Sequence, residues 1–492
     1  MIMKEKEAKL LFTDYFQVSK KAVDDYGAFN ISLVTDLPLF IDPFLLFNSK
    51  DRKYQELHAE IIKYLQFLKD KSVSQQIDNG LLKEWYRFKE VKQNWFGFSA
   101  RNNSGRGLGG DFAKALNENL HNVFKDFGSE EITKGSHLER LCLIKDGVGR
   151  DNISDFTVNL IKEFLLSYTQ EFAQKNLDEK FRKKLVIEKV KFNYETESWE
   201  RGEYELPYVN NDFVLLTPKN ILTKDEGWIN KTDLIEEFHQ IPNAISDEGL
   251  RSQINNYFRS VLPRKPKEKD EREAAYKTIQ QFPILIDYFI KYKETNGDRA
   301  TDISREKVAL SEKLYLQQFK SLADLLAGKT EFYDKSGGTY QEAKDRIQYL
   351  KNVIENNDGY KIFYVNGNPI KTEDDLQILF RLVWFGTTSD VNREVNNGRG
   401  PADFKISRGA NDKTLVEFKL ARNKQLKKNL QNQLEVYKKA NETEKGIHAI
   451  LYFSKDELER VNKILAELKL SVGDDIVLID ARSDNKVSAS KV

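Results

Sequence analysis

Three ionisable residues near the end of the chain have types and spacing that suit hydrolytic chemistry. Glu417 follows Asp403 by fourteen residues and Lys419 follows it by sixteen. Two carboxylates held close together repel each other unless a cation lies between them, and hard oxygen ligands on a rigid scaffold suit Mg²⁺. A neighbouring ammonium can orient a metal-bound water or offset negative charge that develops at phosphorus. These residue types therefore indicate metal-dependent hydrolysis of a phosphodiester bond.

Two predicted strands position these side chains. Residues 402–406 and 415–420 each alternate apolar and polar side chains, which is the period-2 pattern of a half-buried strand. The short stretch between them contains glycine and predicts a hairpin turn. In such a hairpin the apolar side chains face the core. We therefore expect Asp403, Glu417 and Lys419 to share the opposite face.

Residues 401–403 (Pro-Ala-Asp) and 417–419 (Glu-Phe-Lys) resemble the motif of the PD-(D/E)XK nuclease superfamily. Ala402, which separates the proline from the aspartate, is a departure of one residue. Gln433 and Tyr437, on the next predicted helix, resemble the Gln-x-x-x-Tyr element of the RecB-like and phage-exonuclease-like branches. The resemblance covers roughly the last quarter of the chain. It implies a restriction-endonuclease-like fold there and Mg²⁺-dependent cleavage of DNA.

The resemblance also implies a role for each motif residue. Asp403 and Glu417 would hold Mg²⁺, for which Mn²⁺ can substitute, and the backbone carbonyl of Phe418 would be a further ligand. Lys419 would assist the attacking water. Gln433 would position that water or a phosphate, with Tyr437 beside it on the same helical face.

Further polar residues surround the motif. Glu394 on the preceding strand would be a third carboxylate ligand or a residue of the rim. Glu373 occupies a helix on which several branches keep an acidic residue, although the adjacent Asp374 and Asp375 leave that choice open. The basic residues nearby would contact phosphates without reading base sequence, and they are Arg399, Lys405, Arg408, Arg422, Lys424, Lys427 and Lys428.

The predicted fold class is a multidomain α/β protein, since 492 residues suit two to four domains. Residues 1–245 predict a mixed α/β region with a sensing or regulatory role. Residues 246–358 predict a helical spacer or oligomerisation region. Residues 359–483 predict the nuclease domain, an α/β/α core, and residues 484–492 predict a disordered tail.

Hydrophobic periodicity places individual elements within these regions. The N-terminal predictions are strands at 30–34 and 212–218 and helices at 54–69 and 153–172. The middle region predicts helices at 274–293, 307–326 and 339–356. Besides the two motif strands, the C-terminal region predicts a hairpin at 362–367, helices at 373–385, 424–439 and 455–468, and strands at 391–395, 447–453 and 476–479.

Two glycine-containing segments of the N-terminal region could carry a ligand. The backbone amides of 104–111 could cradle a phosphate, although a surface loop is favoured because no Gly-Lys-Ser/Thr follows. In 146–155, Ser154 or Asp151 would cap the helix that follows, or the acidic cluster would bind a metal or ligand as a second site. The five histidines show no metal-ligand spacing, so we expect each to be structural or exposed rather than a metal ligand.

Composition limits the compartment and the partners. The net charge is +1, so a nucleic-acid surface must be a local patch. The single cysteine, Cys142, predicts a buried packing residue and excludes a disulfide framework, as in a reducing cytoplasm. The N-terminus lacks the apolar segment of a signal peptide, and the most apolar run, at 37–47, is too short to span a bilayer. We expect a cytoplasmic protein without a membrane partner.

These observations favour a Mg²⁺-dependent deoxyribonuclease, regulated by its large additional region as in bacterial anti-phage or restriction systems. DNA is the expected partner, with a homo-oligomer or a defence-system protein as further partners. Two alternatives remain open. One is a catalytically inactive subunit that keeps the fold in order to bind nucleic acid or protein, and the other is an RNA nuclease, for example one that cuts tRNA.

Overall fold

The structure is a computed structural model that describes residues 9–486 except for several shorter stretches. These are 35, 75–76, 98–112, 114–115, 118–119, 121–129, 145–147, 225, 319, 322–337, 357–358, 366–367, 371–372, 374–375, 378–379, 381–383, 385–389, 397–400, 409–411, 434–442, 444 and 474. For residues 365, 390–396, 401–403 and 432–433 it describes the backbone alone.

A two-stranded sheet and a short helix lie at the centre of the N-terminal region. β1 (Leu39–Ile41) pairs antiparallel with β5 (Leu222–Lys224), which comes from the far end of the region. α3 (Pro43–Phe47) follows β1 directly, because Asp42 accepts a hydrogen bond from Phe44 N and proline at the first helical position needs no donor. The surrounding helices are α1 (Phe12–Phe16), α2 (Lys20–Tyr26), α4 (Arg52–Ser74), α5 (Asn79–Leu81), α7 (Arg140–Ile144), α8 (Arg150–Leu160) and α9 (Lys162–Asn176).

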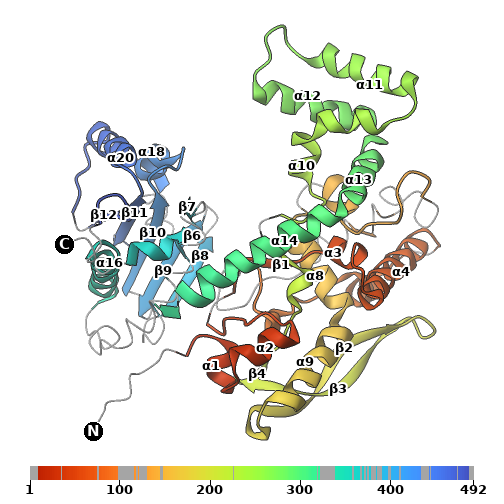
Figure 1. The fold of residues 1–492 in the computed structure, drawn as a ribbon, viewed down its shortest axis with the longest axis horizontal. Helices are drawn as coiled ribbons and strands as arrows, with labels where there is room; N and C mark the ends of the chain where they lie inside the picture. The colour runs from red at the N-terminus through yellow and green to blue at the C-terminus, as the bar shows by residue number, and fades with distance from the viewer. Residues whose placement is uncertain are drawn as a thin grey trace.

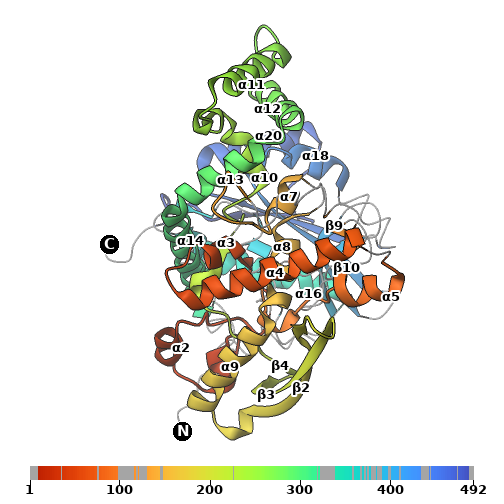
Figure 2. The same ribbon diagram turned by 90° about the vertical axis from the view of Figure 1, so that its right-hand side faces the viewer.

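A long antiparallel hairpin flanks this region, as Figures 1 and 2 show. It consists of β2 (Arg182–Asn193) and β3 (Ser198–Val209), and β3 also pairs with the short β4 (Asp212–Phe213). The hairpin packs against α9. Short helical turns complete the region at η1 (Leu82–Tyr86), η2 (Lys92–Asn94), η3 (Glu179–Phe181), η4 (Lys219–Ile221), η5 (Phe238–Gln240) and η6 (Pro242–Ala244).

The middle of the chain is helical. α10 (Lys231–Glu236) leads to α11 (Glu248–Val261) and α12 (Glu268–Gln281), which pack together and project from the rest of the molecule in Figure 1. α13 (Leu285–Thr295) and α14 (Gly297–Ser311) then run back toward the C-terminal region. The π-helical η7 (Glu312–Gln318) continues α14. α14 contacts β5 on its way, so it touches the centre of the N-terminal region.

The C-terminal region contains a five-stranded mixed sheet in the order β12–β11–β10–β9–β8. β8, β9 and β10 are antiparallel neighbours, whereas β10, β11 and β12 are parallel. The strands span Asp390–Asn396 (β8), Pro401–Arg408 (β9), Asp412–Leu420 (β10), Gly446–Tyr452 (β11) and Ile476–Asp480 (β12). A small hairpin precedes the sheet, with η9 (Gly359–Phe363), β6 (Tyr364–Val365) and β7 (Asn368–Pro369).

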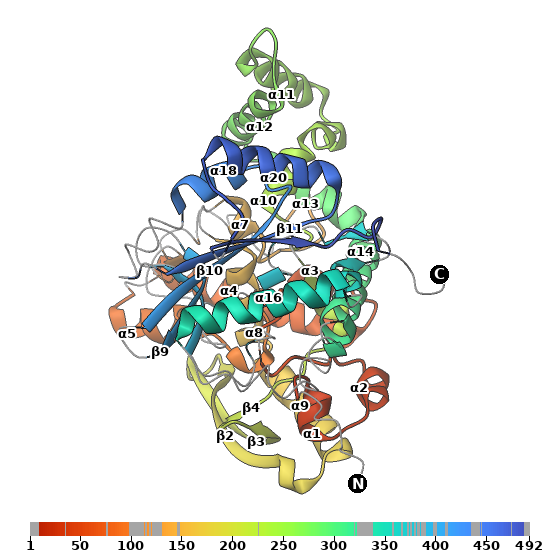
Figure 3. The same cartoon turned by 90° about the vertical axis from the view of Figure 1, so that its left-hand side faces the viewer.

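Helices cover both faces of this sheet, as Figure 3 shows. α16 (Thr339–Asn356) packs on one face through an apolar stripe that includes Ile347 and Leu350. α18 (Leu426–Lys428), its π-helical continuation η10 (Asn429–Gln433) and α20 (Lys455–Glu467) lie on the other. Leu426 and Val461 of these helices share an apolar cluster with Ile450 of β11. The sheet is therefore the middle of three layers.

Several predicted elements are confirmed, beginning with the mixed α/β class. The helix predicted at 54–69 is α4, and the one predicted at 339–356 is α16 with the same bounds. The hairpin of the two motif strands is β9–β10. The hairpin at 362–367, the strands at 391–395, 447–453 and 476–479 and the helix at 455–468 are confirmed as β6–β7, β8, β11, β12 and α20.

Other predicted elements are wrong or only partly right. Residues 30–34 form no strand, because their only ladder contact is a single bridge between Ser32 and Leu11. The strand at 212–218 ends at Phe213. The helix at 153–172 is two helices, α8 and α9, that break at Ile161. The helix at 274–293 is also divided, since Pro283 cannot donate a backbone hydrogen bond.

The remaining helix predictions extend beyond the described residues. For 307–326, helical structure begins earlier, at Gly297, and is described through Gln318. The helix predicted at 424–439 is confirmed as far as it is described, since α18 and η10 together span 426–433. The helix at 373–385 and the tail at 484–492 fall largely outside the described residues, as does the glycine-rich stretch 104–111. Within the described ranges, no helix has both the length and the apolar composition needed to cross a bilayer.

Candidate active site on the central strand

β10 is the middle strand of the sheet, and its residues from Thr414 to Leu420 are all buried. Its Val416 pairs with Phe404 of β9, so the next positions along the two strands are Glu417 and Asp403. Directly opposed residues of neighbouring strands share a face of the sheet. The register therefore assigns positions 403 and 417 to the same face.

Glu417 is fully buried, with a relative exposure of 0%. On its other side β10 pairs in parallel with β11, and there Glu417 lies opposite His448. The distance between His448 Nδ1 and Glu417 Oε2 is 3.6 Å. A buried carboxylate is costly unless a cation or hydrogen-bond donors compensate it. The imidazole of His448 is a nearby group that can carry positive charge beside this carboxylate.

Lys419 lies two residues further along β10 on the same face and is 4% exposed. Its Nζ is 3.5 Å from Oε2 of Glu373. The other oxygen of Glu373 accepts hydrogen bonds from Leu420 N at 3.2 Å and from Asn423 Nδ2 at 2.7 Å. One carboxylate thus holds both the ammonium of Lys419 and the end of the strand that carries it.

The sequence predicts a strand with one exposed face, whereas both faces of β10 are buried. The alternation correctly separated Glu417 and Lys419 from Val416 and Phe418. Yet both faces of β10 are covered, because α18 and α20 lie over the face that carries Glu417. The charged residues therefore occupy the interior.

The structure describes only part of the predicted site. Glu394 and Asp403 occupy adjacent strands, β8 and β9, where Arg393 pairs with Phe404 and Val395 with Ala402. Their side chains are not described, and neither is that of Gln433, which ends η10. Tyr437, Arg399, Asp374 and Asp375 lie outside the described residues.

Some of the basic residues that were predicted to contact phosphates instead contact groups of the protein. The Arg422 guanidinium donates to Ile370 O and stacks 5.0 Å from the Phe453 ring centroid. Lys427 forms an ion pair of 2.8 Å with Glu467.

Arg408 likewise pairs with a protein group, since it binds Glu342 on α16 at 2.5 Å. Lys405 is half-buried on β9, and Lys424 and Lys428 are exposed on the side of α18. The exposed pair is therefore best placed to meet a phosphate backbone.

The donor set near Glu417 partly fits a hard divalent cation. In the described part of the chain, no three His, Cys, Asp or Glu side chains gather in a metal-holding arrangement. Glu417 contributes one buried carboxylate, and the register brings a second acidic position, 403, to the same face. Mg²⁺ commonly takes one or two protein carboxylates and keeps several waters, so this pair suits it.

His448 is the neighbour of the site that sequence reasoning missed. The histidines were expected to be structural or exposed because none has metal-ligand spacing. The available signal was its place in the predicted strand at 447–453. Its proximity to Glu417 depends on the register between β10 and β11, which the intervening crossover sets.

The second-site segment 146–155 also differs from expectation. Asp151 and Ser154 do not cap α8, because both lie inside the helix. Gly149 is the N-cap residue, and its N–H donates to Asn152 Oδ1. The Ser154 hydroxyl instead accepts a hydrogen bond from Ile41 N of β1, which ties α8 to the central pair of strands.

Two family models match the chain, one in the N-terminal region and one in the C-terminal region. Residues 17–230 match the model of a domain of unknown function, DUF8370, and residues 339–455 match that of another, DUF8371. The second match includes α16, the strands from β8 to β11, and positions 373, 403, 417 and 419. No curated protein and no solved structure matched the chain.

Proposed function

We propose that the C-terminal region is a metal-dependent nuclease that hydrolyses phosphodiester bonds of DNA. The observation that carries this proposal is the pair of buried charged residues, Glu417 and Lys419, on one face of the central strand. Burying two charges two residues apart is costly, and such groups persist where they perform chemistry or hold an ion. The sheet order and the helices on both faces support a restriction-endonuclease-like core for residues 359–483.

Each residue has a role in this proposal. Glu417, together with Asp403, would hold Mg²⁺ or Mn²⁺, with the Phe418 carbonyl as a further ligand. The bound ion would supply a polarised water and offset charge on the phosphate. Lys419 would orient the attacking water or stabilise the charge that develops at phosphorus. Glu373 would position Lys419, and Gln433 would position the water or a phosphate.

The protein as a whole would be a regulated nuclease in a bacterial defence or restriction system, located in the cytoplasm. The size of the N-terminal and middle regions supports regulation, because they are far larger than the site needs. RNA remains the alternative substrate.

The decisive experiment compares Lys419→Met with the wild type. Methionine keeps most of the buried volume and removes the charge, so the fold should survive. We expect Mg²⁺-dependent cleavage of plasmid or single-stranded DNA to fall about 100-fold or more, as for loss of a group that assists proton transfer. Lys463→Ala, on the exposed side of α20, is the matched control and should cut normally.

Three outcomes decide the proposal. Loss of activity in Lys419→Met and in Asp403→Asn, with unchanged circular dichroism, supports it. Cleavage of RNA alone would redirect it to the alternative substrate. If the wild type binds nucleic acid but cuts none with Mg²⁺ or Mn²⁺, the catalytically inactive alternative replaces it.

A further inference from the structure

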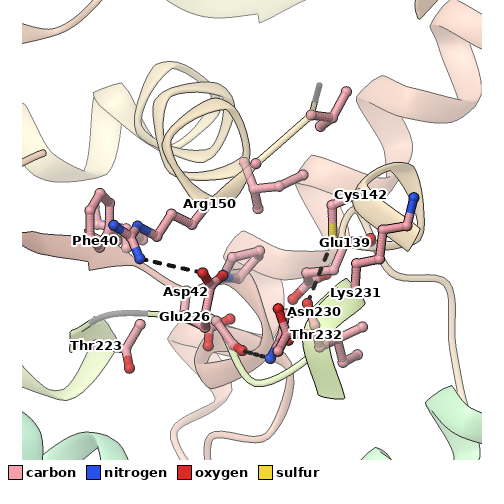
Figure 4. Close-up of a pocket in the computed structure, with 17 residues that line it drawn as sticks. Phe40, Asp42, Glu139, Cys142, Arg150, Thr223, Glu226, Asn230, Lys231 and Thr232 are labelled. Atoms are coloured by element: carbon pink, nitrogen blue, oxygen red, sulfur yellow. Dashed lines mark hydrogen bonds and ion pairs between the residues drawn. The ribbon is translucent and has the colours of Figure 1, made fainter. Parts of the chain in front are cut away.

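A cavity lies in the N-terminal region, far along the chain from β10. It has a volume of about 220 Å³, is partly open to solvent, and is lined by residues of β1, α7, α8, β5 and the start of α10. Figure 4 shows the acidic side chains of Asp42, Glu139 and Glu226 around it. Apolar walls come from Phe40, Ile41, Ile153 and Ile229.

Glu139 is the unusual group in this cavity. It is 2% exposed, and neither of its carboxylate oxygens makes a hydrogen bond of normal geometry, although the peptide groups of Glu139 and Phe44 lie close enough to interact with it. Burial raises the pKa of Glu139 to about 8, and the charge of Asp42 contributes in the same direction. The peptide groups of Glu139 itself and of Phe44 offset only part of that cost. A buried acceptor in this condition destabilises the folded state, and a suitable donor would relieve that cost.

Asp42, by contrast, is well satisfied. Its two oxygens accept hydrogen bonds from Phe44 N at 3.0 Å and from Trp228 N at 2.7 Å. Burial nevertheless raises its pKa, because the loss of solvent disfavours the charged form of the carboxyl group. Two acidic groups therefore meet, and of the two only Asp42 accepts hydrogen bonds of normal geometry from peptide groups.

The basic residues of the lining are engaged at the rim. Arg150 Nη1 lies 3.4 Å from Glu226 Oε1, and its guanidinium stacks 4.8 Å from the centroid of Phe40. The Lys231 ammonium lies 5.3 Å from the Tyr276 ring centroid. Cys142 Sγ donates to backbone carbonyls of Glu139 and Ile229 rather than to a carboxylate. None of these contacts is made to the Glu139 carboxylate.

We propose that this cavity binds a small organic cation, an ammonium or guanidinium group whose N–H donors pair with Glu139. The apolar and aromatic walls suit the carbon skeleton of such a ligand. Its volume is below the roughly 300–1,000 Å³ of sites for drug-sized ligands, so the cation must be compact. A metal ion fits less well, because no three metal-ligating side chains of the described residues come together there.

This assignment gives residues 148–155, the described part of the segment 146–155, a different use from capping. Gly149 and Arg150 line the cavity where α8 begins, and Ile153 follows one turn later. The segment thus contributes walls and a rim, while the recognising carboxylate comes from the residue before α7. The proposal is independent of nuclease activity, since it concerns a different region of the chain.

The test uses the full chain and two probes, methylguanidinium and butylammonium chloride, at low millimolar concentration. We expect at least one of them to raise the Tm of the wild type by several degrees and to bind in calorimetry, because a ligand of the folded state stabilises it. N-methylurea, a neutral analogue of methylguanidinium, should have no effect. Glu139→Gln removes the charge with little change of volume and should abolish the shift.

Glu248→Gln is the control, since Glu248 is an exposed acid on α11 and its loss should leave the shift intact. Glu139→Gln should itself be at least as stable as the wild type, because it removes a buried acid, so a failure to fold is not the expected reason for lost binding. The proposal is overturned if neither cation binds the wild type or if Glu139→Gln responds equally. It is also overturned if Mg²⁺, Mn²⁺ or Zn²⁺ alone gives the Glu139-dependent shift.

Discussion

Glu373 joins two parts of the candidate site with a single carboxylate. One oxygen lies near the Lys419 ammonium, and the other accepts from Leu420 N and Asn423. These contacts separate two possible roles. Glutamine at this position can still accept from Leu420 and Asn423, but it cannot provide a negative charge for Lys419.

Replacing Glu373 should therefore distinguish positioning from structure. We expect Glu373→Ala to lower the free energy of unfolding by about 1–3 kcal/mol, because buried donors lose their acceptor. Glu373→Gln should restore most of that stability while DNA cleavage stays reduced about tenfold or more, with a shifted pH profile for cleavage. Wild-type cleavage by a stable Glu373→Gln would reduce Glu373 to a purely structural residue.

His58 gives the stability of the molecule a dependence on pH. Burial lowers the pKa of His58 to about 3, assisted by His137 nearby, and the ring packs 5.2 Å from Phe47. In the unfolded chain a histidine titrates near pH 6.5. Below that pH the unfolded state binds a proton that the folded state does not, so stability falls as pH decreases from about 6.5 toward 3.

Replacing this histidine with a residue that does not titrate should remove the effect. We compare the free energy of unfolding of His58→Leu with that of the wild type at each pH. This difference should shift in favour of the variant by about 2 kcal/mol between pH 8 and pH 5. His239→Leu, at an exposed position, should show no such difference. Urea unfolding of all three proteins at both pH values measures it, and parallel pH profiles for wild type and His58→Leu would contradict the assignment.

The residue types of the site could be predicted from the sequence, but several of their neighbours could not. The alternation of apolar and polar residues along 415–420 placed Glu417 and Lys419 on one face. Glu373 could not be separated from Asp374 and Asp375 by sequence, because adjacent helical positions differ only in direction. Such choices depend on how a helix is rotated against the sheet, which is a property of tertiary packing.

At the scale of elements, α14 docks on the N-terminal region through its first turn. Gly297 begins the helix directly against the Asn48 side chain, and a Cβ at this position would overlap with the Asn48 amide. Asn48 Nδ2 in turn donates to Thr301 Oγ1 at 3.2 Å. Glycine therefore allows this close approach of Asn48, and a larger residue would force the asparagine side chain to move.

A double-mutant cycle tests this contact. We expect Gly297→Ala to cost about 1–3 kcal/mol, because the asparagine must move and lose its bond to Thr301. Asn48→Ala should make room, so that adding Gly297→Ala to it costs much less. An additive double mutant, measured by thermal or urea unfolding, would falsify the close approach.

Elements with a strong local signal were predictable, and those set by tertiary contacts were not. The helix at 339–356 has an uninterrupted apolar stripe, and its bounds agree with the structure. The hairpin of β2 and β3 was not anticipated, because much of it is exposed and rich in charge. The break at Ile161 has no proline or glycine to announce it, and it follows from the packing of α8 and α9 against different parts of the region.

At the scale of the whole molecule, charge offers no general attraction for nucleic acid. Lysine and arginine number 78 and aspartate and glutamate 77, which gives a net charge of +1. Any binding must come from a local group of basic residues, and Lys424 and Lys428 are exposed near the candidate site. The chain also offers a matched pair, since Lys265 and Lys267 are exposed beside the projecting helices α11 and α12.

Removal of equal charge at these two places should have unequal effects. We expect Lys424→Ala with Lys428→Ala to weaken DNA binding and to reduce the slope of log affinity against log salt by about 2, one for each lost phosphate contact. Lys265→Ala with Lys267→Ala should change neither quantity. Fluorescence anisotropy over a range of salt concentrations measures both, and equal slopes for the two double variants would place the binding surface elsewhere.

α14 connects the acidic cavity with the C-terminal region. Ser304 Oγ donates to Thr223 Oγ1 of β5 at 3.2 Å, and Thr223 lines the cavity. Where the helix continues into η7, Gln318 Nε2 donates to Tyr364 O of β6 at 3.2 Å. Any linkage between two binding sites of one molecule is reciprocal. Whatever factor a bound cation imposes on the affinity for nucleic acid, nucleic acid must impose on the affinity for the cation.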